Sequence, residues 1–400
     1  MKMGDLYIGV STDTEILQRT EGGGVVTSLL KFALEHRIVD AVFAVRKGNS
    51  RYEATPSFIT DPEAVKECAG SFHFAAPGLA KNVKKYLDTR NEKIAVVCKP
   101  CDARALLELA KINQVNIDNI IIVGLNCSGT LAAVPTTNML RECGLDPDAL
   151  IGEDIDGEDV TFQFEGIAEK VFKVEELEKR GFGRRRNCQR CDYPIPRMAD
   201  LACGKCGGTG ERGTFVEVCS AKGKDLLARA VARGLIKIRP PSQKQITLRQ
   251  QKEAEKIRSA RARQAVEFGD YDANPHAYAD LQSCTKCYGC RDVCPLCHCK
   301  VCVLERDEPE TVEKGIIPPP PTFAMIRLYH VAPYCVNCGQ CEDVCSADLP
   351  ISSLAHYLNR KATDLFGYEP GLDTSSPLPL SAAPPECQAN PSTELPALKS

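Results

Sequence analysis

The chain has almost no net charge and no long apolar run. Its 400 residues carry a formal net charge of −3, which gives no electrostatic reason to expect nucleic acid as a partner. The longest apolar stretches, at 41–45 and 119–125, have the length of a strand and are too short to span a membrane. The N-terminal residues contain no apolar core of signal-peptide length. These absences predict a cytoplasmic protein with no membrane span and no nucleic-acid partner.

Cysteine is the residue present in unusual number, at 22 positions. In a cytoplasmic protein, closely spaced cysteines bind metal more often than they form disulfides. Two runs, 284–294 and 335–345, repeat the spacing C-x2-C-x2-C-x3-C. In bacterial ferredoxins such a run gives three thiolates to one 4Fe–4S cluster and its fourth to the other. The spacing predicts Cys284, Cys287, Cys290 and Cys345 as ligands of one cluster, and Cys335, Cys338, Cys341 and Cys294 as ligands of the second.

A third group of cysteines has the spacing C-x2-C-x11-C-x2-C and comprises Cys188, Cys191, Cys203 and Cys206. Two such pairs suit a structural zinc ion and a single 4Fe–4S cluster equally well. Three more cysteines follow predicted strands and are alternative ligands or thiols beside a cofactor: Cys98, Cys101 and Cys127. Cys297, Cys299 and Cys302 lie between the two runs as packing thiols, zinc ligands with His298, or part of a further site. Packing or shielding of a cluster is the interpretation we favour for these last three.

Apolar strands alternate with helical patterns over the first 241 residues, which predicts an α/β domain with a mainly parallel sheet. The alternation at 160–174 predicts antiparallel strands that extend this sheet. Residues 242–274 are charged and free of proline, so we expect an exposed connecting helix. A ferredoxin-like two-cluster module is expected at 275–365, and a disordered tail rich in proline and serine at 366–400.

A glycine turn is the candidate for holding a phosphate group. Gly22, Gly23 and Gly24 allow close backbone approach, and Thr27 and Ser28 offer hydroxyls at the start of a predicted helix. Such a turn is weak evidence by itself. His73 and Lys81 are further candidates for a pocket, although each is as well explained by a structural role.

Three segments in this order, EGGGVVTSLLKFALEH, VVCKPCDARALLEL and CQRCDYP, resemble the coenzyme F420 hydrogenase/dehydrogenase beta-subunit family. The resemblance implies bound FAD, iron–sulfur clusters and exchange of hydride with coenzyme F420. It places Lys99 and Asp102 near the flavin, and it favours a third cluster over zinc at 188–206.

The appended two-cluster module makes the electron-transfer and flavin subunit of an F420-dependent formate dehydrogenase the expected role. The resemblance then implies an alpha subunit with molybdopterin (molybdenum or tungsten) that oxidises formate, and heterodisulfide reductase as a further candidate partner. Two alternatives stay open. One is the beta subunit of another F420-dependent complex, such as a hydrogenase, and the other is a non-catalytic ferredoxin-like electron wire without flavin.

Overall fold

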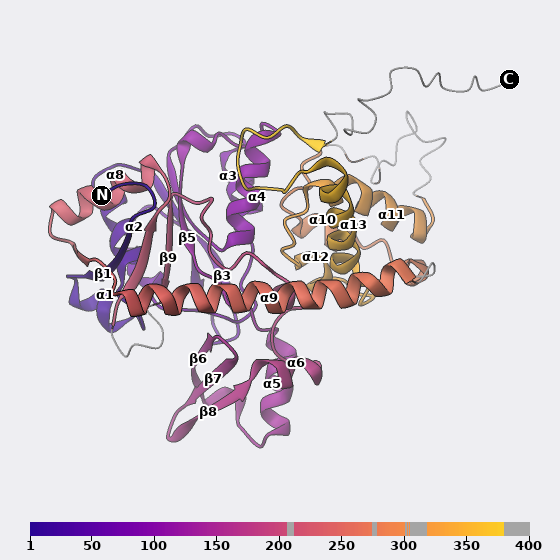
Figure 1. The fold of residues 1–400 in the computed structure, drawn as a ribbon, viewed down its shortest axis with the longest axis horizontal. Helices are drawn as coiled ribbons and strands as arrows, with labels where there is room; N and C mark the ends of the chain where they lie inside the picture. Colours follow the sequence, from indigo (N-terminus) through magenta and orange to yellow (C-terminus); the bar gives the residue numbers. More distant parts are fainter. Residues whose placement is uncertain (206–211, 274–277, 301, 303, 305–317, 380–400) are drawn as a thin grey trace.

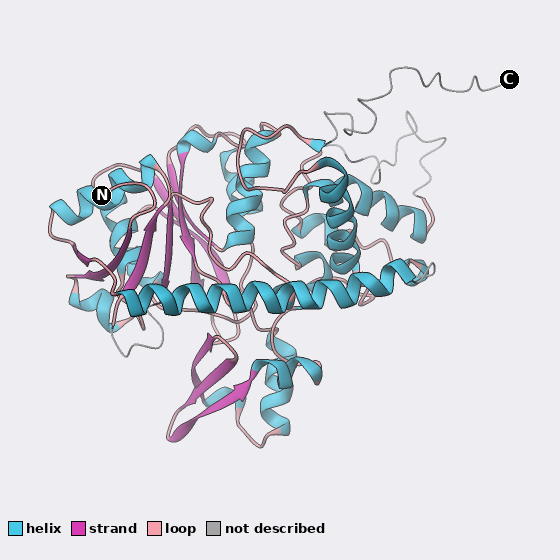
Figure 2. Cartoon of the chain, in the orientation of Figure 1, coloured by secondary structure: helices cyan, strands magenta, loops and turns pink. Residues whose placement is uncertain are grey.

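A sheet of eight strands with helices on both faces forms the larger part of the molecule (Figures 1 and 2). The computed structural model describes residues 1–205, 212–273, 278–300, 302, 304 and 318–379. The strands lie side by side in the order β11 (Ile236–Arg239), β1 (Leu6–Ser11), β10 (Thr214–Val218), β9 (Leu201–Lys205), β5 (Ile120–Leu125), β4 (Ile94–Cys98), β2 (Ala41–Lys47) and β3 (Ala54–Ile59).

The four strands from β9 to β2 are parallel, and the strands outside them pair in antiparallel fashion. The sheet is therefore mixed, whereas the sequence predicted a mainly parallel one. The difference arises at short connections. Residues 48–53 join β2 to β3, which is too short for the crossover that a parallel pair needs.

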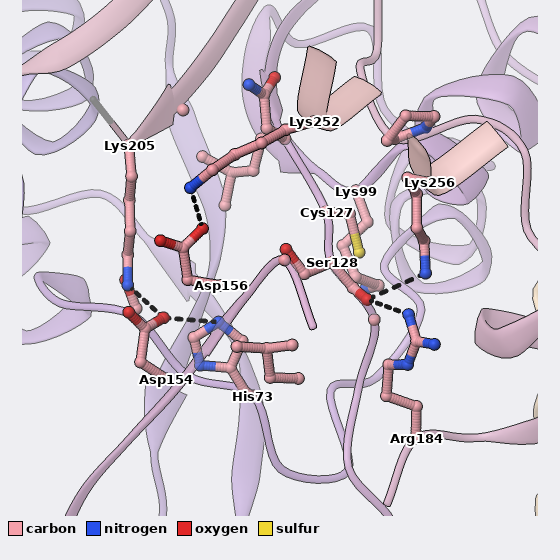
Figure 3. Close-up of a pocket in the computed structure, with 18 of the residues that line it drawn as sticks. His73, Lys99, Cys127, Ser128, Asp154, Asp156, Arg184, Lys205, Lys252 and Lys256 are labelled. Atoms are coloured by element: carbon pink, nitrogen blue, oxygen red, sulfur yellow. Dashed lines mark hydrogen bonds and ion pairs between the residues drawn. The ribbon is translucent and has the colours of Figure 1, made fainter. Parts of the chain in front are cut away.

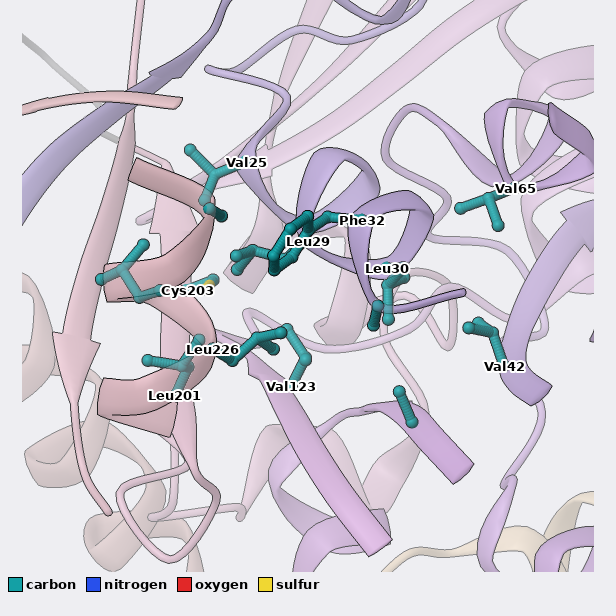
Figure 4. Close-up of a cluster of buried hydrophobic side chains, with 14 of the residues drawn as sticks. Val25, Leu29, Leu30, Phe32, Val42, Val65, Val123, Leu201, Cys203 and Leu226 are labelled. Carbon is teal, nitrogen blue, oxygen red and sulfur yellow. The ribbon is translucent and has the colours of Figure 1, made fainter. Parts of the chain in front are cut away.

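Alternation along the strands assigns their side chains to two apolar layers. Val42, Ala95 and Val123 face helices α2 (Val25–Glu35) and α8 (Ala221–Ala232) (Figure 4). The neighbouring residues Phe43, Val96 and Ile122 face the opposite layer. That second layer is covered by α3 (Ala80–Leu87) and α4 (Pro100–Lys111), and it also receives Leu296 and Val336 from the cysteine-rich module. The sheet and the module therefore share one apolar core.

A small three-stranded antiparallel sheet lies below the large one in Figure 1. It consists of β6 (Leu150–Asp156), β7 (Asp159–Phe164) and β8 (Ile167–Lys173), and it packs with α5 (Ala133–Glu142) and α6 (Val174–Lys179). The expectation that residues 160–174 extend the main sheet is wrong. Their apolar face is buried in a separate core with Phe162, Leu140 and Leu177.

Helix α9 (Gln243–Ala273) is the predicted connecting helix. Its 31 residues correspond to about 46 Å at ~1.5 Å per residue, and it runs past the sheet to the cysteine-rich module (Figure 1). The remaining helices are α1 (Thr14–Gln18), α7 (Arg186–Gln189), α10 (Gly289–Val293), α11 (Pro320–Val331), α12 (Gln340–Asp343) and α13 (Ile351–Phe366). None of the helices in the described ranges is both long enough and apolar enough to cross a membrane.

The segment after α13 packs on α4, so the predicted disordered tail is wrong for its first residues. The buried hydroxyl of Tyr368 donates to Glu108 at 2.6 Å, and the backbone N–H of Gly371 donates to the same carboxylate at 2.7 Å. Arg104 donates to the carbonyl of Pro370 at 2.7 Å. Buried polar partners of this kind hold the segment in place. Residues 380–400 of the predicted tail lie outside the described residues.

Candidate functional site

A cavity of about 1480 Å³ lies at the carboxyl ends of the parallel strands. Residues that end or follow β2, β4 and β5 line one side, residues of β6–β7 another, and one face of α9 a third. Ligands of open α/β sheets bind at this edge. The volume exceeds the roughly 300–1,000 Å³ of a pocket for one drug-sized ligand, so the cavity has room for more than one small molecule.

The predicted glycine turn contributes to this cavity. Gly22, Gly24 and Thr27 line it, and Gly24 is the N-cap of α2 with φ of 67°. Among the described residues no side chain caps this helix, and uncapped N-terminal N–H groups of a helix are suited to an anion. Gly23 has a different role. A Cβ there would lie 2.2 Å from the carbonyl oxygen of Gly9, so the residue lets the turn pack on β1.

Lys99 brings a positive charge to the cavity at the carboxyl end of β4. Its ammonium group donates to the Asp102 carboxylate at 2.7 Å and to the carbonyl of Pro77 at 2.5 Å. Burial opposes the charge, but Asp102 and Cys101 outweigh it and raise the pKa of Lys99. Asp102 is buried and also accepts from the N–H of Leu79 at 2.8 Å. It therefore orients Lys99 and does not line the cavity itself.

His73 lines the cavity beside the small sheet (Figure 3). Its backbone N–H donates to Glu153 at 3.0 Å, and its Nε2 lies 3.9 Å from the Asp154 carboxylate, which also pairs with Lys205. Burial lowers the pKa of His73 to about 4, and the charge of Lys205 acts in the same direction. The imidazole is therefore neutral at neutral pH.

Two cations reach the cavity at the loop that follows β5. Lys256 of α9 donates to the carbonyl of Ser128 at 3.2 Å and to that of Cys188 at 3.0 Å. Arg184 donates to the same Ser128 carbonyl at 3.1 Å and pairs with Glu178 (Figure 3). These contacts fix the loop that carries Cys127 against the segment that carries Cys188.

Cys127 lies close to Cys188 and Cys191 at this loop. Burial raises the pKa of the Cys127 thiol to about 11, and the charges of Cys188 and Cys191 raise it further. A Cβ on Gly129 would lie 3.1 Å from the Cβ of Cys188, so the two segments are in contact. Cys101, in the first turn of α4, is within the electrostatic range of Cys127. Electrostatic interactions thus link thiols from three separate segments: Cys127 with Cys188 and Cys191, and Cys101 with Cys127.

Cys203, which the spacing grouped with Cys188 and Cys191, is located elsewhere. It lies on β9 with the same facing as Leu201, and it packs in the apolar layer beneath α2 and α8 (Figure 4). Burial raises its pKa to about 12, with a smaller contribution from Cys219. The structure therefore does not bring Cys203 to the other two cysteines. Cys206 lies outside the described residues.

The two ferredoxin-type runs form two neighbouring groups of thiols. Burial is the main cause that raises the pKa of Cys341, and the charges of Cys338, Cys335 and Cys294 raise it further. The other group includes Cys284, Cys287 and Cys290. The Ser346 hydroxyl lies 3.7 Å from the Cys287 sulfur, and a Cβ on Gly289 would lie 3.2 Å from the Val344 carbonyl oxygen. Residues 344–346 thus reach the first run, and Cys294 reaches the second.

Among the described residues, no three His, Cys, Asp or Glu side chains converge closely enough to hold one metal ion. A 4Fe–4S cube separates its thiolates by the width of the cluster, whereas zinc draws four ligands around one atom.

The second group adjoins the thiols of the α/β domain. Cys338 is within the electrostatic range of Cys101. Arg185 lies at this junction, where it donates to the Cys338 carbonyl at 3.3 Å and pairs with Asp343. Cys101 thus interacts electrostatically both with Cys338 of the second run and with Cys127, which lines the cavity.

The α/β part of the chain matches a known protein family. The profile of the family "Coenzyme F420 hydrogenase/dehydrogenase, beta subunit" matches twice, with its N-terminal part at residues 6–81 and its C-terminal part at 91–244. The F420-dependent formate dehydrogenase subunit beta of Methanocaldococcus jannaschii is 45% identical over 92% of this chain and 96% of its own length. The chain belongs to the coenzyme F420 hydrogenase/dehydrogenase beta-subunit family.

Other relatives differ in how much of the chain they cover. The F420-dependent formate dehydrogenase 1 subunit beta of Methanococcus maripaludis is 40% identical over 95% of the chain and 99% of its own length. A chain of the F420-reducing [NiFe] hydrogenase complex from Methanosarcina barkeri aligns with a TM-score of 0.59 at 18% identity, over 66% of this chain and 92% of its own length. That likeness is one of fold, and it supports the family's α/β architecture.

Within this family member, some residues singled out in the sequence lie away from the cavity. Ser28 is buried and shares a 2.7 Å hydrogen bond with Ser11. The Lys81 ammonium donates to the carbonyl of Arg291 at 2.8 Å, so it joins α3 to the cysteine-rich module. Cys98 is buried in the layer beneath α3 and α4. Cys302 packs with Leu304 and Phe323, as expected for a packing thiol.

Sequence reasoning missed Arg185 and Lys256. Arg185 belongs to a run of basic residues at 184–186, and this run, placed directly before Cys188, was the available signal. Lys256 is one of many charges on a helix with a polar character all round, so nothing in its pattern marks it.

Proposed function

We propose that this chain is the electron-transfer and flavin subunit of an F420-dependent formate dehydrogenase. Electrons from formate oxidation in a partner subunit enter at the cysteine-rich module and leave as hydride on coenzyme F420, and the reaction is reversible. The relatives that match over almost the whole chain carry this name, and their match includes the two-cluster module. The observation that carries the proposal is that Cys101 interacts electrostatically both with Cys338 of the second run and with Cys127, which lines the cavity.

Three groups of cysteines in this proposal hold 4Fe–4S clusters. The ferredoxin-type runs supply two of them with crossed ligands, Cys345 for the first run and Cys294 for the second. For the third we propose Cys101, Cys127, Cys188 and Cys191, because Cys127 interacts electrostatically with each of the other three, whereas Cys203 packs in the apolar layer. Thiolate-only ligand sets of this kind suit iron–sulfur clusters.

The cavity is the proposed site for FAD and for coenzyme F420. The Gly22–Gly24 turn and the uncapped start of α2 fit a pyrophosphate, which needs close backbone approach and N–H donors. Lys99 fits a group that gains negative charge on reduction. When bound, the clusters carry single electrons and the flavin exchanges them for a hydride. The chain's own residues hold these groups, orient them and keep a cation beside them.

The partner in this proposal is an alpha subunit with molybdopterin that oxidises formate, and heterodisulfide reductase is a further candidate partner. Relatives named for the hydrogenase are less similar. The coenzyme F420 hydrogenase subunit beta of Methanococcus voltae is 23% identical over 56% of the chain. That match covers little more than half of the chain, whereas the formate dehydrogenase relatives match over more than nine tenths of it, and we therefore favour the formate dehydrogenase.

The test is an anaerobic preparation of the complex with iron, zinc and flavin quantified. We expect about twelve irons per beta chain, one FAD, and loss of flavin absorbance when reduced coenzyme F420 is added. A protein that takes up no flavin at micromolar concentration establishes the wire without flavin instead. Zinc in place of about four of the irons establishes a structural site at the third group.

A further inference from the structure

Arg327 is a buried cation on the apolar face of α11. Its neighbours on that face, Phe323, Ala324 and Leu328, belong to the cores of the cysteine-rich module. The arginine is itself 5% exposed. A charge in such a position is costly unless an opposite charge accompanies it.

The partners of Arg327 are thiols. Its Nη1 donates to the sulfur of Cys297 at 3.0 Å. Within the described residues it forms no ion pair with a carboxylate, and its buried Nε has no hydrogen-bond partner. Cys297 is not a predicted cluster ligand, but its N–H donates to the carbonyl of Cys294, which places it one turn after a ligand.

The helix that carries Arg327 packs beside both ferredoxin-type groups. Its residues Ala324 and Leu328 belong to a core that Cys290 of the first run and Cys335 of the second also contact, and the charge of Arg327 acts on Cys290 and on Cys294. One permanent positive charge thus faces members of both groups.

We propose that Arg327 is the shared counter-charge of the two clusters and sets both of their reduction potentials. The inference rests on the proposed function, because it requires clusters at these cysteines. Reduction adds a negative charge to a cluster, and a nearby cation stabilises that charge, so Arg327 raises both potentials. Because the two clusters share this cation, its charge shifts both potentials in the same direction. Arg327 is a positioning residue in this proposal, since it acts through the clusters and not on a substrate.

The test is an anaerobic redox titration of the complete complex, followed by electron paramagnetic resonance. Arg327→Gln removes the charge, and Arg327→Lys retains it. Arg360→Gln is the matched control, because Arg360 lies in the same module on α13 and pairs with Glu369 at 3.1 Å, away from the thiols. We expect the signals of both clusters to shift to lower potential in Arg327→Gln and to stay near the wild-type values in the other two variants.

Unchanged potentials in a fully loaded Arg327→Gln protein overturn the proposal, as does a shift of equal size in the Arg360→Gln control. If Arg327→Gln loses iron, the lysine variant decides: retained iron supports the role of the charge, and equal loss shows that the arginine acts by packing. Failure of the proposed function is distinguishable, because the wild-type module then holds fewer than about eight irons before any residue is changed.

Discussion

The cysteine-rich module and the α/β domain both gather thiols, but in opposite ways. In the module each proposed group takes three cysteines from one run of eleven residues and a single cysteine from the other run. In the α/β domain the four thiols of the proposed third group come from α4, from the loop after β5, and from the segment around α7. Spacing along the sequence therefore predicts neighbours when the chain between them is short. Spacing does not predict neighbours when strands of the sheet separate the cysteines in the sequence, because the sheet then decides which residues lie close together.

The largest effect is expected when one thiol of the α/β group is removed. We expect Cys127→Ser to lose about four irons per chain and to reduce formate-driven reduction of coenzyme F420 by orders of magnitude, because a serine oxygen is a poor ligand for iron. Cys203→Ser is the matched control, and we expect its iron content to equal that of the wild type. Iron and activity assays of both variants measure this. The reverse result would restore the grouping by spacing.

The crossed ligands of the module provide the next test. Cys284 and Cys345 are about sixty residues apart in sequence. We expect Cys284→Ser and Cys345→Ser each to remove the same cluster signal in electron paramagnetic resonance. Formate-driven reduction of coenzyme F420 should fall by orders of magnitude in each, while exchange between reduced coenzyme F420 and flavin continues. Loss of two different signals would contradict the crossed arrangement.

The junction between the two regions allows a test of stability. Glu108 on α4 accepts from Tyr368 and Gly371 and lies 3.5 Å from the buried Lys111 ammonium. Glu108→Ala leaves that lysine without its carboxylate, which typically costs about 3–5 kcal/mol. We expect a clearly lower apparent Tm of the complex in thermal unfolding. Glu142→Ala, which removes an exposed pair with Arg180, should change stability by less than ~1 kcal/mol.

The smallest expected effect is a dependence on pH in the α/β domain. His73 has a folded pKa of about 4, below the unfolded value near 6.5, so the unfolded chain binds more protons between these values. Its contribution to stability is complete above about pH 6.5 and declines as the pH falls toward 4. We expect the Tm of His73→Asn to fall less than that of the wild type from pH 7 to pH 4.5, by a difference on the order of a few degrees. Parallel curves for the two proteins would show that His73 does not titrate in this way.

Several features of the fold could be predicted from the sequence. The alternation of apolar strands and helices predicted the α/β domain, and α9 follows the predicted connecting helix closely. The sequence did not reveal the separate sheet of β6–β8, because alternation shows that a strand has one buried face and not which core receives it. The packing of Tyr368 on α4 was missed for a similar reason, since a segment rich in proline can be held by a few buried hydrogen bonds.

The two ferredoxin-type runs and the glycine turn before α2 were predictable from short stretches of sequence. Both depend on residues a few positions apart, whose separation in space the backbone limits to a few ångströms per residue. Tertiary structure decided the rest of the site. The strand period sends Cys203 into the apolar layer with Leu201, while parallel strands bring Lys99, Cys101 and Cys127 to the same edge of the sheet. Arg185 reaches Cys338 because the module packs on the domain, and Arg327 reaches Cys297 because α11 packs against the cysteine-rich segment. The sequence around a basic residue does not indicate which partner it will contact.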